Sequence, residues 1–126
     1  MGTHSMIGIY NPADGSVNAS YCHYDGYLEG VGRTLVDHYN TQYDAEIVAR
    51  GGYLSSLSPD YAESRQESVH SDIAVPYESV EQFLANGYDY CGAEYIYLWC
   101  GEAWFFATPG EMFEEVEMNL NNELTN

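Results

Sequence analysis

Residues 94–107 constrain the fold more than any other segment, because they hold two short strand patterns without a polar face. Tyrosine, isoleucine, tyrosine, leucine and tryptophan follow one another over 95–99, so aromatic side chains fall on one face and aliphatic ones on the other. After a turn at 100–102 the chain returns as Ala103-Trp-Phe-Phe-Ala107. Strands that are apolar on both faces are buried, so we expect this hairpin to lie centrally in a sheet.

A second hairpin is indicated near the N-terminus. Met6–Tyr10 is a short β-type run, and Asn11–Gly15 is rich in turn-forming residues. Ser16–Tyr24 then alternates between two faces, which is typical of a strand. In this pattern His23 and its neighbour Cys22 point to opposite faces.

Helical patterns occupy much of the remaining chain. Leu28–Tyr39 carries apolar residues at spacings of three and four, and Tyr43–Arg50 ends at two glycines. A short helix is expected from Val80 to about Gly87. Residues 53–77 are irregular, and we expect a long loop there with one short helix around 61–67.

The C-terminal segment predicts an acidic helix over residues 109–126. Thr108 can serve as N-cap, Pro109 suits the first helical position, and Glu111 completes a capping box. Apolar residues then recur as one stripe, at Phe113, Val116, Leu120 and Leu124.

The composition favours one compact domain over residues 1–126. Hydrophobic residues make up 45% of the chain, and thirteen Tyr, four Phe and two Trp supply large apolar areas. We therefore expect an α+β fold with about four antiparallel strands in two hairpins and three to four helices packed on one face.

Charge excludes several classes of function. Twenty Asp and Glu residues oppose three Arg and no Lys, which gives a net charge of −17. Such a chain is unsuited to bind the phosphate backbone of nucleic acids or anionic membranes. No segment approaches the roughly 20 apolar residues of a membrane span. Twelve of the twenty acids follow Arg65, in a stretch without any cation.

The three cysteines bear on the cellular compartment. Cys22, Cys91 and Cys100 are odd in number and do not have the spacing of a metal motif. Met1–Met6 lacks the basic and apolar regions of a signal peptide. We expect reduced thiols and a cytoplasmic protein.

The most distinctive stretch is Gly15–Tyr39, which contains Tyr21-Cys-His-Tyr-Asp-Gly-Tyr27 and then Gly-x-x-Leu-x-x-His-Tyr. With Gly52-Tyr-Leu-Ser-Ser-Leu57 and the strand at 93–99 followed by Trp104, it resembles a family of small phage and prophage proteins without an assigned function. The similarity covers residues 3 to about 107, but residues 58–77 depart from the pattern and the acidic tail is additional. The resemblance implies a phage-type origin and a place in the host bacterial cytoplasm. It transfers no catalytic residue.

His23 and Asp25, with Asp37 and His38 on the next helix, form a histidine-rich grouping. These residues could ligate a divalent metal or act as an acid–base pair. The explanation that we expect is a packing role for His23, with Asp25 capping the following helix, because the spacing matches no established metal motif. Cys22 could be a nucleophile with His38 as its base, or a buried small apolar residue.

The acidity also has two possible explanations. It could increase solubility or reflect adaptation to high salt, or it could mimic DNA. Carboxylates spaced along a surface can imitate duplex phosphates and occupy the basic groove of a host defence or transcription protein. We expect a binding protein and inhibitor rather than an enzyme, without cofactor or metal. The expected partner-binding residues are Glu94, Glu102, Glu111, Glu114, Glu115 and Glu117, with a second surface of Tyr24, Asp25, Tyr27 and His38.

Two alternatives remain at this stage. One is a small metal-dependent enzyme or metal-binding module centred on His23, Asp25 and His38. The other is a homodimer, formed through an exposed edge of the aromatic hairpin.

Overall fold

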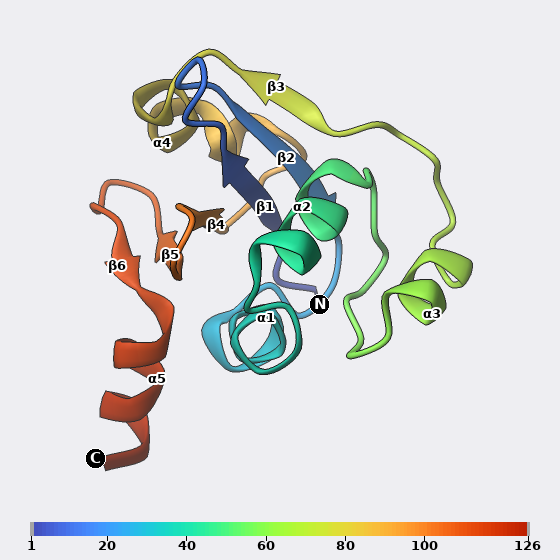
Figure 1. Ribbon diagram of the computed structural model, residues 1–126. Coiled ribbons are helices and arrows are strands. Elements are labelled where there is room, and N and C mark those ends of the chain that lie inside the picture. Colours follow the sequence, from blue (N-terminus) through green and yellow to red (C-terminus); the bar gives the residue numbers. More distant parts are fainter. Residues whose placement is uncertain (1, 126) are drawn as a thin grey trace.

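A six-stranded mixed sheet organises the chain (Figure 1). The structure, a computed structural model, describes residues 2–125, and the side chains of residues 2–120. In spatial order the strands are β3 (Val75–Tyr77), β2 (Val17–Cys22), β1 (Ser5–Tyr10), β4 (Tyr95–Trp99), β5 (Trp104–Ala107) and β6 (Glu114–Glu115).

The two expected hairpins are confirmed, but the way they join is not antiparallel. β1 pairs antiparallel with β2, and β4 pairs antiparallel with β5. β1 and β4 lie side by side in parallel, with Ser5 opposite Tyr95 and Ile9 opposite Trp99. The expectation of four antiparallel strands in two hairpins is therefore wrong, because the hairpins share this parallel junction and because two short edge strands extend the sheet.

Within residues 2–125, five α-helices accompany the sheet. They are α1 (Arg33–His38), α2 (Gln42–Arg50), α3 (Tyr61–Gln66), α4 (Val80–Asn86) and α5 (Val116–Thr125). A π-helical turn, Leu28–Gly32, leads into α1, and a 3₁₀ turn, Gly87–Asp89, follows α4. The side chains of Thr41, Asp60 and Ser79 accept backbone N–H groups at the starts of α2, α3 and α4, as N-caps do. Among these helices none is long and apolar enough to cross a bilayer.

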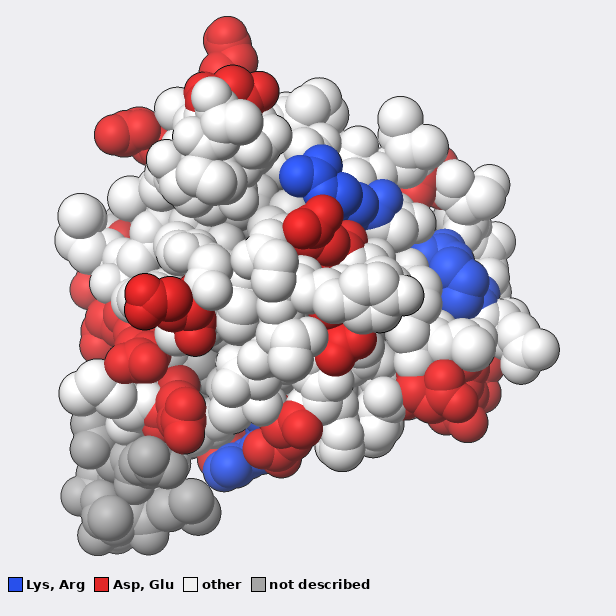
Figure 2. Space-filling model, in the orientation of Figure 1, with Lys and Arg blue, Asp and Glu red and all other residues white. Residues whose placement is uncertain are grey.

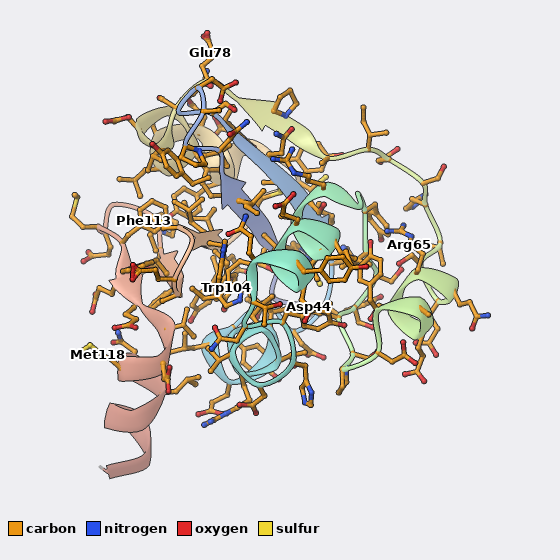
Figure 3. The ribbon with its side chains drawn as sticks, in the orientation of Figure 1. Asp44, Arg65, Glu78, Trp104, Phe113 and Met118 are labelled. Carbon is orange, nitrogen blue, oxygen red and sulfur yellow. The ribbon has the colours of Figure 1, made fainter. Side chains whose placement is uncertain are left out.

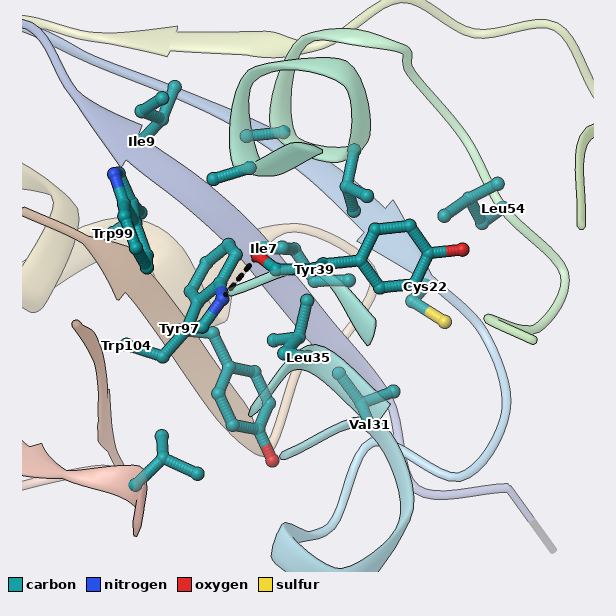
Figure 4. Packing of buried hydrophobic residues seen from close by; sticks show 14 of the residues in the cluster. Ile7, Ile9, Cys22, Val31, Leu35, Tyr39, Leu54, Tyr97, Trp99 and Trp104 are labelled. Atoms are coloured by element: carbon teal, nitrogen blue, oxygen red, sulfur yellow. Dashed lines mark hydrogen bonds between the residues drawn. The ribbon is translucent and has the colours of Figure 1, made fainter. Parts of the chain in front are cut away.

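Helices cover both faces of the sheet, which corrects the expectation of one covered face. On one face α1, α2 and α5 pack over Ile7, Tyr97 and Trp104 (Figure 4). On the other face Phe83 of α4 packs in a cluster with Ile96. The cause is the alternation in β4, where neighbouring buried residues point to opposite faces and each face needs its own cover.

In the π-helical turn the backbone at Gly30 and Val31 lies close to the backbone of Asp25. The Val31 N–H donates to the carbonyl oxygen of Asp25 at 2.8 Å. A Cβ atom at Gly30 would lie 2.2 Å from that same oxygen. Glycine is therefore required at position 30, and the chain reaches α-helical geometry only from Arg33.

The predicted helix over 109–126 is wrong in its first seven residues. The Glu111 N–H closes a turn on the carbonyl oxygen of Thr108, and Gly110 has φ +85°. The chain then forms β6 against β5, and α5 begins only at Val116.

Packing explains why the capping pattern at 108–111 does not start a helix. Phe113 joins the cluster of Phe83, with ring centroids 6.4 Å apart, whereas Val116 and Leu120 join the cluster on the opposite face. The apolar stripe of one helix faces a single side of the sheet, so it could not place Phe113 on one face and Val116 on the other. The chain instead passes from one face to the other at the edge of the sheet, where it forms β6. The side chain of Leu124 lies outside the described residues.

A substitution at Tyr97 tests the packing of the sheet face that α1, α2 and α5 cover. Tyr97 is fully buried, and its hydroxyl donates to the carbonyl oxygen of Gly26 at 2.7 Å. Tyr97→Phe should cost about 1–2 kcal/mol in the free energy of unfolding, because a buried carbonyl loses its donor. Tyr27→Phe, at an exposed position, should change it by less than about 0.5 kcal/mol. Urea unfolding of both variants measures the difference, and equal midpoints would contradict it.

Candidate functional site

Carboxylates are the prevailing charged groups of the surface. None of the Asp and Glu side chains in residues 2–120 is buried. Figure 2 shows them along both the left and the right margins of the face that it presents. The surface potential is therefore negative over widely separated parts of this face.

The three arginines compensate little of this negative charge beyond their immediate neighbours, because each contacts a nearby carboxylate or backbone carbonyl group. Arg33 pairs with Glu29 at 3.2 Å and Arg50 with Glu46 at 3.6 Å, one helical turn away in each case. Arg65 donates to backbone carbonyl oxygens, and Figure 3 shows it between α3 and α2. All three precede residue 66, so the twelve later acids have no cation among them.

The expected acidic surface on the C-terminal segment is redistributed by the fold. Glu114 and Glu115 are neighbours on β6 and point to opposite faces of the sheet. Glu117 is exposed on α5, and Glu111 lies in the turn beside α4, where it lines a hollow with Tyr88. The four residues surround the β6 edge instead of forming one helical stripe.

The hairpin carboxylates are separated. Glu94 and Glu102 lie at opposite ends of β4, since one precedes the strand and the other follows it. Glu102 shares a hollow of about 460 Å³ with Phe105 and Glu115. The structure thus brings Glu102 to the β6 edge and leaves Glu94 at the other end of the sheet.

The residues of the second expected surface are all exposed, but they combine aromatic, acidic and imidazole side chains. Tyr24 and Tyr27 are 49% and 43% exposed, and both flank Asp25, whose φ is +59°. Asp25 supports the following helical turn through its backbone carbonyl and not through its carboxylate. His38 is exposed at the end of α1.

The grouping of His23 with His38 is not what the fold assembles. His23 stacks on His4 at a ring distance of 4.5 Å and is hydrogen-bonded through Nδ1 to the Tyr21 hydroxyl at 2.9 Å. Across residues 2–120 the structure shows no group of three His, Cys, Asp or Glu side chains that could hold a metal ion. Cys22 is fully buried, and burial raises the pKa of its thiol to about 12, which keeps it protonated and unreactive.

A pocket of about 330 Å³ lies at the end of the sheet where β1 and β4 begin and β2 ends. We call it the His–Tyr pocket; its lining residues are His4, Tyr21, His23, Tyr53, His70, Asp72, Tyr90 and Cys91. They come from five separate segments of the chain, including the irregular loop at 53–77.

Tyr21 is the centre of the His–Tyr pocket. Its ring lies 5.7 Å from that of Tyr53, 5.5 Å from that of Tyr90 and 5.8 Å from that of His4. His70 meets Tyr53 edge-on at 4.9 Å. Tyr21 and Tyr53 are nearly buried and form the floor, whereas His70, Asp72 and Cys91 are exposed at the rim.

The lining of the pocket contains one carboxylate, that of Asp72, and neither Lys nor Arg. Burial raises the pKa of Tyr21, and burial together with the neighbouring Asp72 raises the pKa of Tyr90, so both hydroxyls stay protonated. The two tyrosines therefore add no negative charge near neutral pH.

Two backbone contacts fix the loop side of the pocket. The Tyr53 N–H donates to the carbonyl oxygen of Asp72 at 2.8 Å, and Arg65 donates to the carbonyl oxygen of Tyr53. These bonds hold the floor residue Tyr53 against the segment that carries Asp72.

Comparison with protein families, with curated proteins and with solved structures finds no match to this chain.

The three thiols should differ in reactivity. Cys91 and Cys100 reach the surface and Cys22 is buried. The atoms around Cys100 desolvate its thiol in part and raise the pKa of that thiol. At about pH 8 a disulfide reagent should react first with Cys91, then with Cys100, and with Cys22 only after unfolding. The absorbance of the released thiolate measures this, with Cys22→Ala as control. Three equal rates in the native protein would contradict the burial.

The unpaired carboxylates should make stability depend on salt. Their mutual repulsion favours expanded states, and counter-ions screen it. Raising NaCl from about 20 mM to about 0.5 M should move the midpoint of urea unfolding upward. A midpoint that stays constant or falls would show that repulsion does not limit stability.

Proposed function

We propose that this protein binds a basic protein surface of the kind that contacts nucleic acid, and blocks it by presenting carboxylates in place of phosphates. The observation that carries the proposal is the asymmetry of charge. All three arginines are engaged within the chain, whereas every described carboxylate reaches the surface. A partner with a positive surface meets many carboxylates and few cations, and Arg33 and Arg50, which both reach the surface, are each paired with a glutamate one helical turn away.

Duplex DNA presents one negative charge per about 1.7 Å of axis, and proteins that bind it carry matching Lys and Arg side chains. A rigid acidic domain can occupy such a surface without supplying bases for sequence reading. Electrostatic attraction of this kind speeds association and weakens with salt.

The β6 edge is the surface that we propose for this contact. Glu102 and Glu115 meet there in one hollow, with Glu111, Glu114 and Glu117 around them. β6 pairs with β5, and β5 pairs with β4, so Glu114 and Glu115 are attached to the main sheet. Tyr24 and Tyr27 offer exposed aromatic rings of the type that anchor interfaces.

The resemblance of residues 3–107 to small phage proteins supports a bacterial host protein as the partner. Inhibition of a defence or transcription protein would then follow from occupation of its nucleic-acid groove. The proposed role requires no chemical step, so we propose a binding protein and not an enzyme.

The test uses immobilised full-length protein and nucleic-acid-binding proteins enriched from a bacterial lysate on heparin. We expect retained proteins to be released by excess duplex DNA at low salt and by NaCl below about 1 M. Retention that survives both treatments would overturn mimicry, as would the absence of any protein displaced by DNA.

Paired variants locate the contact. Glu114→Gln with Glu117→Gln should weaken binding of a DNA-displaced partner about tenfold, because two charges leave the β6 edge. Glu63→Gln with Glu67→Gln removes the same charge from α3 and its end, and should weaken binding less than about threefold. Equal losses in affinity would show that net charge acts without a defined surface.

A further inference from the structure

We propose that the His–Tyr pocket binds the guanidinium group of an arginine side chain, with Asp72 as its counter-ion and the rings of Tyr21, Tyr53 and Tyr90 as the aromatic part of its lining. The identification of that arginine as part of a basic partner protein rests on the proposed function. The pocket itself is a binding site separate from the β6 edge, since it lies at the opposite end of β4.

The size of the pocket suits one side chain. Its volume of about 330 Å³ stands at the lower limit of small-molecule sites. Its floor is nearly buried, whereas Asp72 and His70 at the rim are exposed. A group that hangs from another chain can therefore enter from the side of the rim.

The tyrosine rings of the lining lie in different planes. The ring of Tyr21 is inclined by 36° to that of Tyr53 and by 57° to that of Tyr90. Several aromatic rings gathered at one pocket favour an organic cation, because ring faces attract positive charge. Flat stacking of a single large ring would require parallel walls, which these angles do not provide.

Hydrogen-bond acceptors complete the site. The Asp72 carboxylate lies beside Tyr90 at the rim. His4 Nδ1 donates to the carbonyl oxygen of His23 at 2.7 Å, so in the neutral ring Nε2 is left as an acceptor. A guanidinium carries five N–H donors in a fixed fork and uses carboxylate and ring acceptors together.

The surrounding charge selects against other ligands. The lining contains neither Arg nor Lys, and Arg65, which touches the Tyr53 backbone, has its guanidinium on the carbonyl oxygens of Tyr53 and Gly51. Glu94 stands at the same end of the sheet, because its N–H donates to the carbonyl oxygen of His4. An anion would meet the Asp72 and Glu94 carboxylates, and the lining offers it neither Lys nor Arg.

Arginine fits better than lysine. A guanidinium stacks on aromatic faces and is weakly hydrated, whereas an ammonium is a strongly hydrated point charge. The mixture of ring faces and one carboxylate therefore favours the planar cation.

The experiment is an NMR titration of the full chain with the capped peptide acetyl-Gly-Arg-Gly-amide. The matched probe replaces arginine by citrulline, which keeps the shape and removes the charge. We expect saturable shifts of the Tyr53, Asp72 and Tyr90 signals with the arginine peptide and about fivefold weaker binding, or none, with citrulline. Equal binding of the two peptides would overturn the proposal, and so would shifts confined to other parts of the protein.

Variants provide the second arm. Asp72→Asn and Tyr90→Leu should each weaken the arginine peptide about fivefold or more, and Tyr90→Phe should retain most of the affinity, because it keeps the ring. Asp14→Asn is the matched control; it removes the same charge at the turn between β1 and β2, at the far end of that hairpin. An equal loss in Asp14→Asn and Asp72→Asn would overturn a local site.

The outcomes separate this proposal from the proposed function. Capture of a DNA-displaced partner together with no peptide binding would overturn the pocket and leave mimicry standing. Peptide binding that depends on Asp72, without any DNA-displaced partner, would support the pocket and overturn mimicry.

Discussion

The parallel pairing of β1 with β4 is the interaction on which the rest of the structure depends. β1 is buried from Ser5 to Ile9 and forms ladders with β2 on one side and β4 on the other. This position joins the N-terminal hairpin to the last third of the chain and divides the core in two. Helices must then cover each face separately, since both central strands are apolar on both sides. On the larger face the Trp104 indole donates to the carbonyl oxygen of Tyr39, which ties β5 to the end of α1 (Figure 4).

The same pairing creates the His–Tyr pocket. Because β1 and β4 run in parallel, their starts lie at one end of the sheet, and the antiparallel β2 ends there as well. Tyr21 from β2 and Tyr90 from the segment before β4 therefore meet, and the loop after α2 closes the remaining side. The sequence could not reveal this site, since its residues come from five segments with no shared spacing. His23 was recognisable as a candidate, but its partners His4 and His70 are 19 and 47 residues away in the chain.

Local sequence patterns predicted most of the helices and strands. The features that they did not predict, the parallel junction and the fold of residues 108–115, depend on packing between distant parts of the chain. The alternation in 95–99, the turn at 11–15 and the helical spacing in 28–39 depend on neighbouring residues, and the structure confirms them. The parallel junction joins residues about 90 positions apart, and no local signal reports it. The capping pattern at Thr108 is a local signal that lost to packing, because Phe113 and Val116 belong to different faces. Similarly, composition predicted an acidic surface, but only the fold shows that Glu114 and Glu115 belong to an edge strand and not to the last helix.

Distributed charge and a defined pocket affect recognition in different ways, the first through the rate of association and the second through discrimination among partners. Carboxylates spread over a surface accelerate encounter with any basic protein, and they discriminate little among such proteins. Discrimination requires a directional contact that a wrong partner leaves unsatisfied. Aromatic faces around one carboxylate supply such a contact, because only a correctly placed planar cation uses both. In the proposed role, the acidic surface meets many basic proteins, and a partner stays bound only where one of its arginines reaches Asp72 while the β6 edge is also in contact.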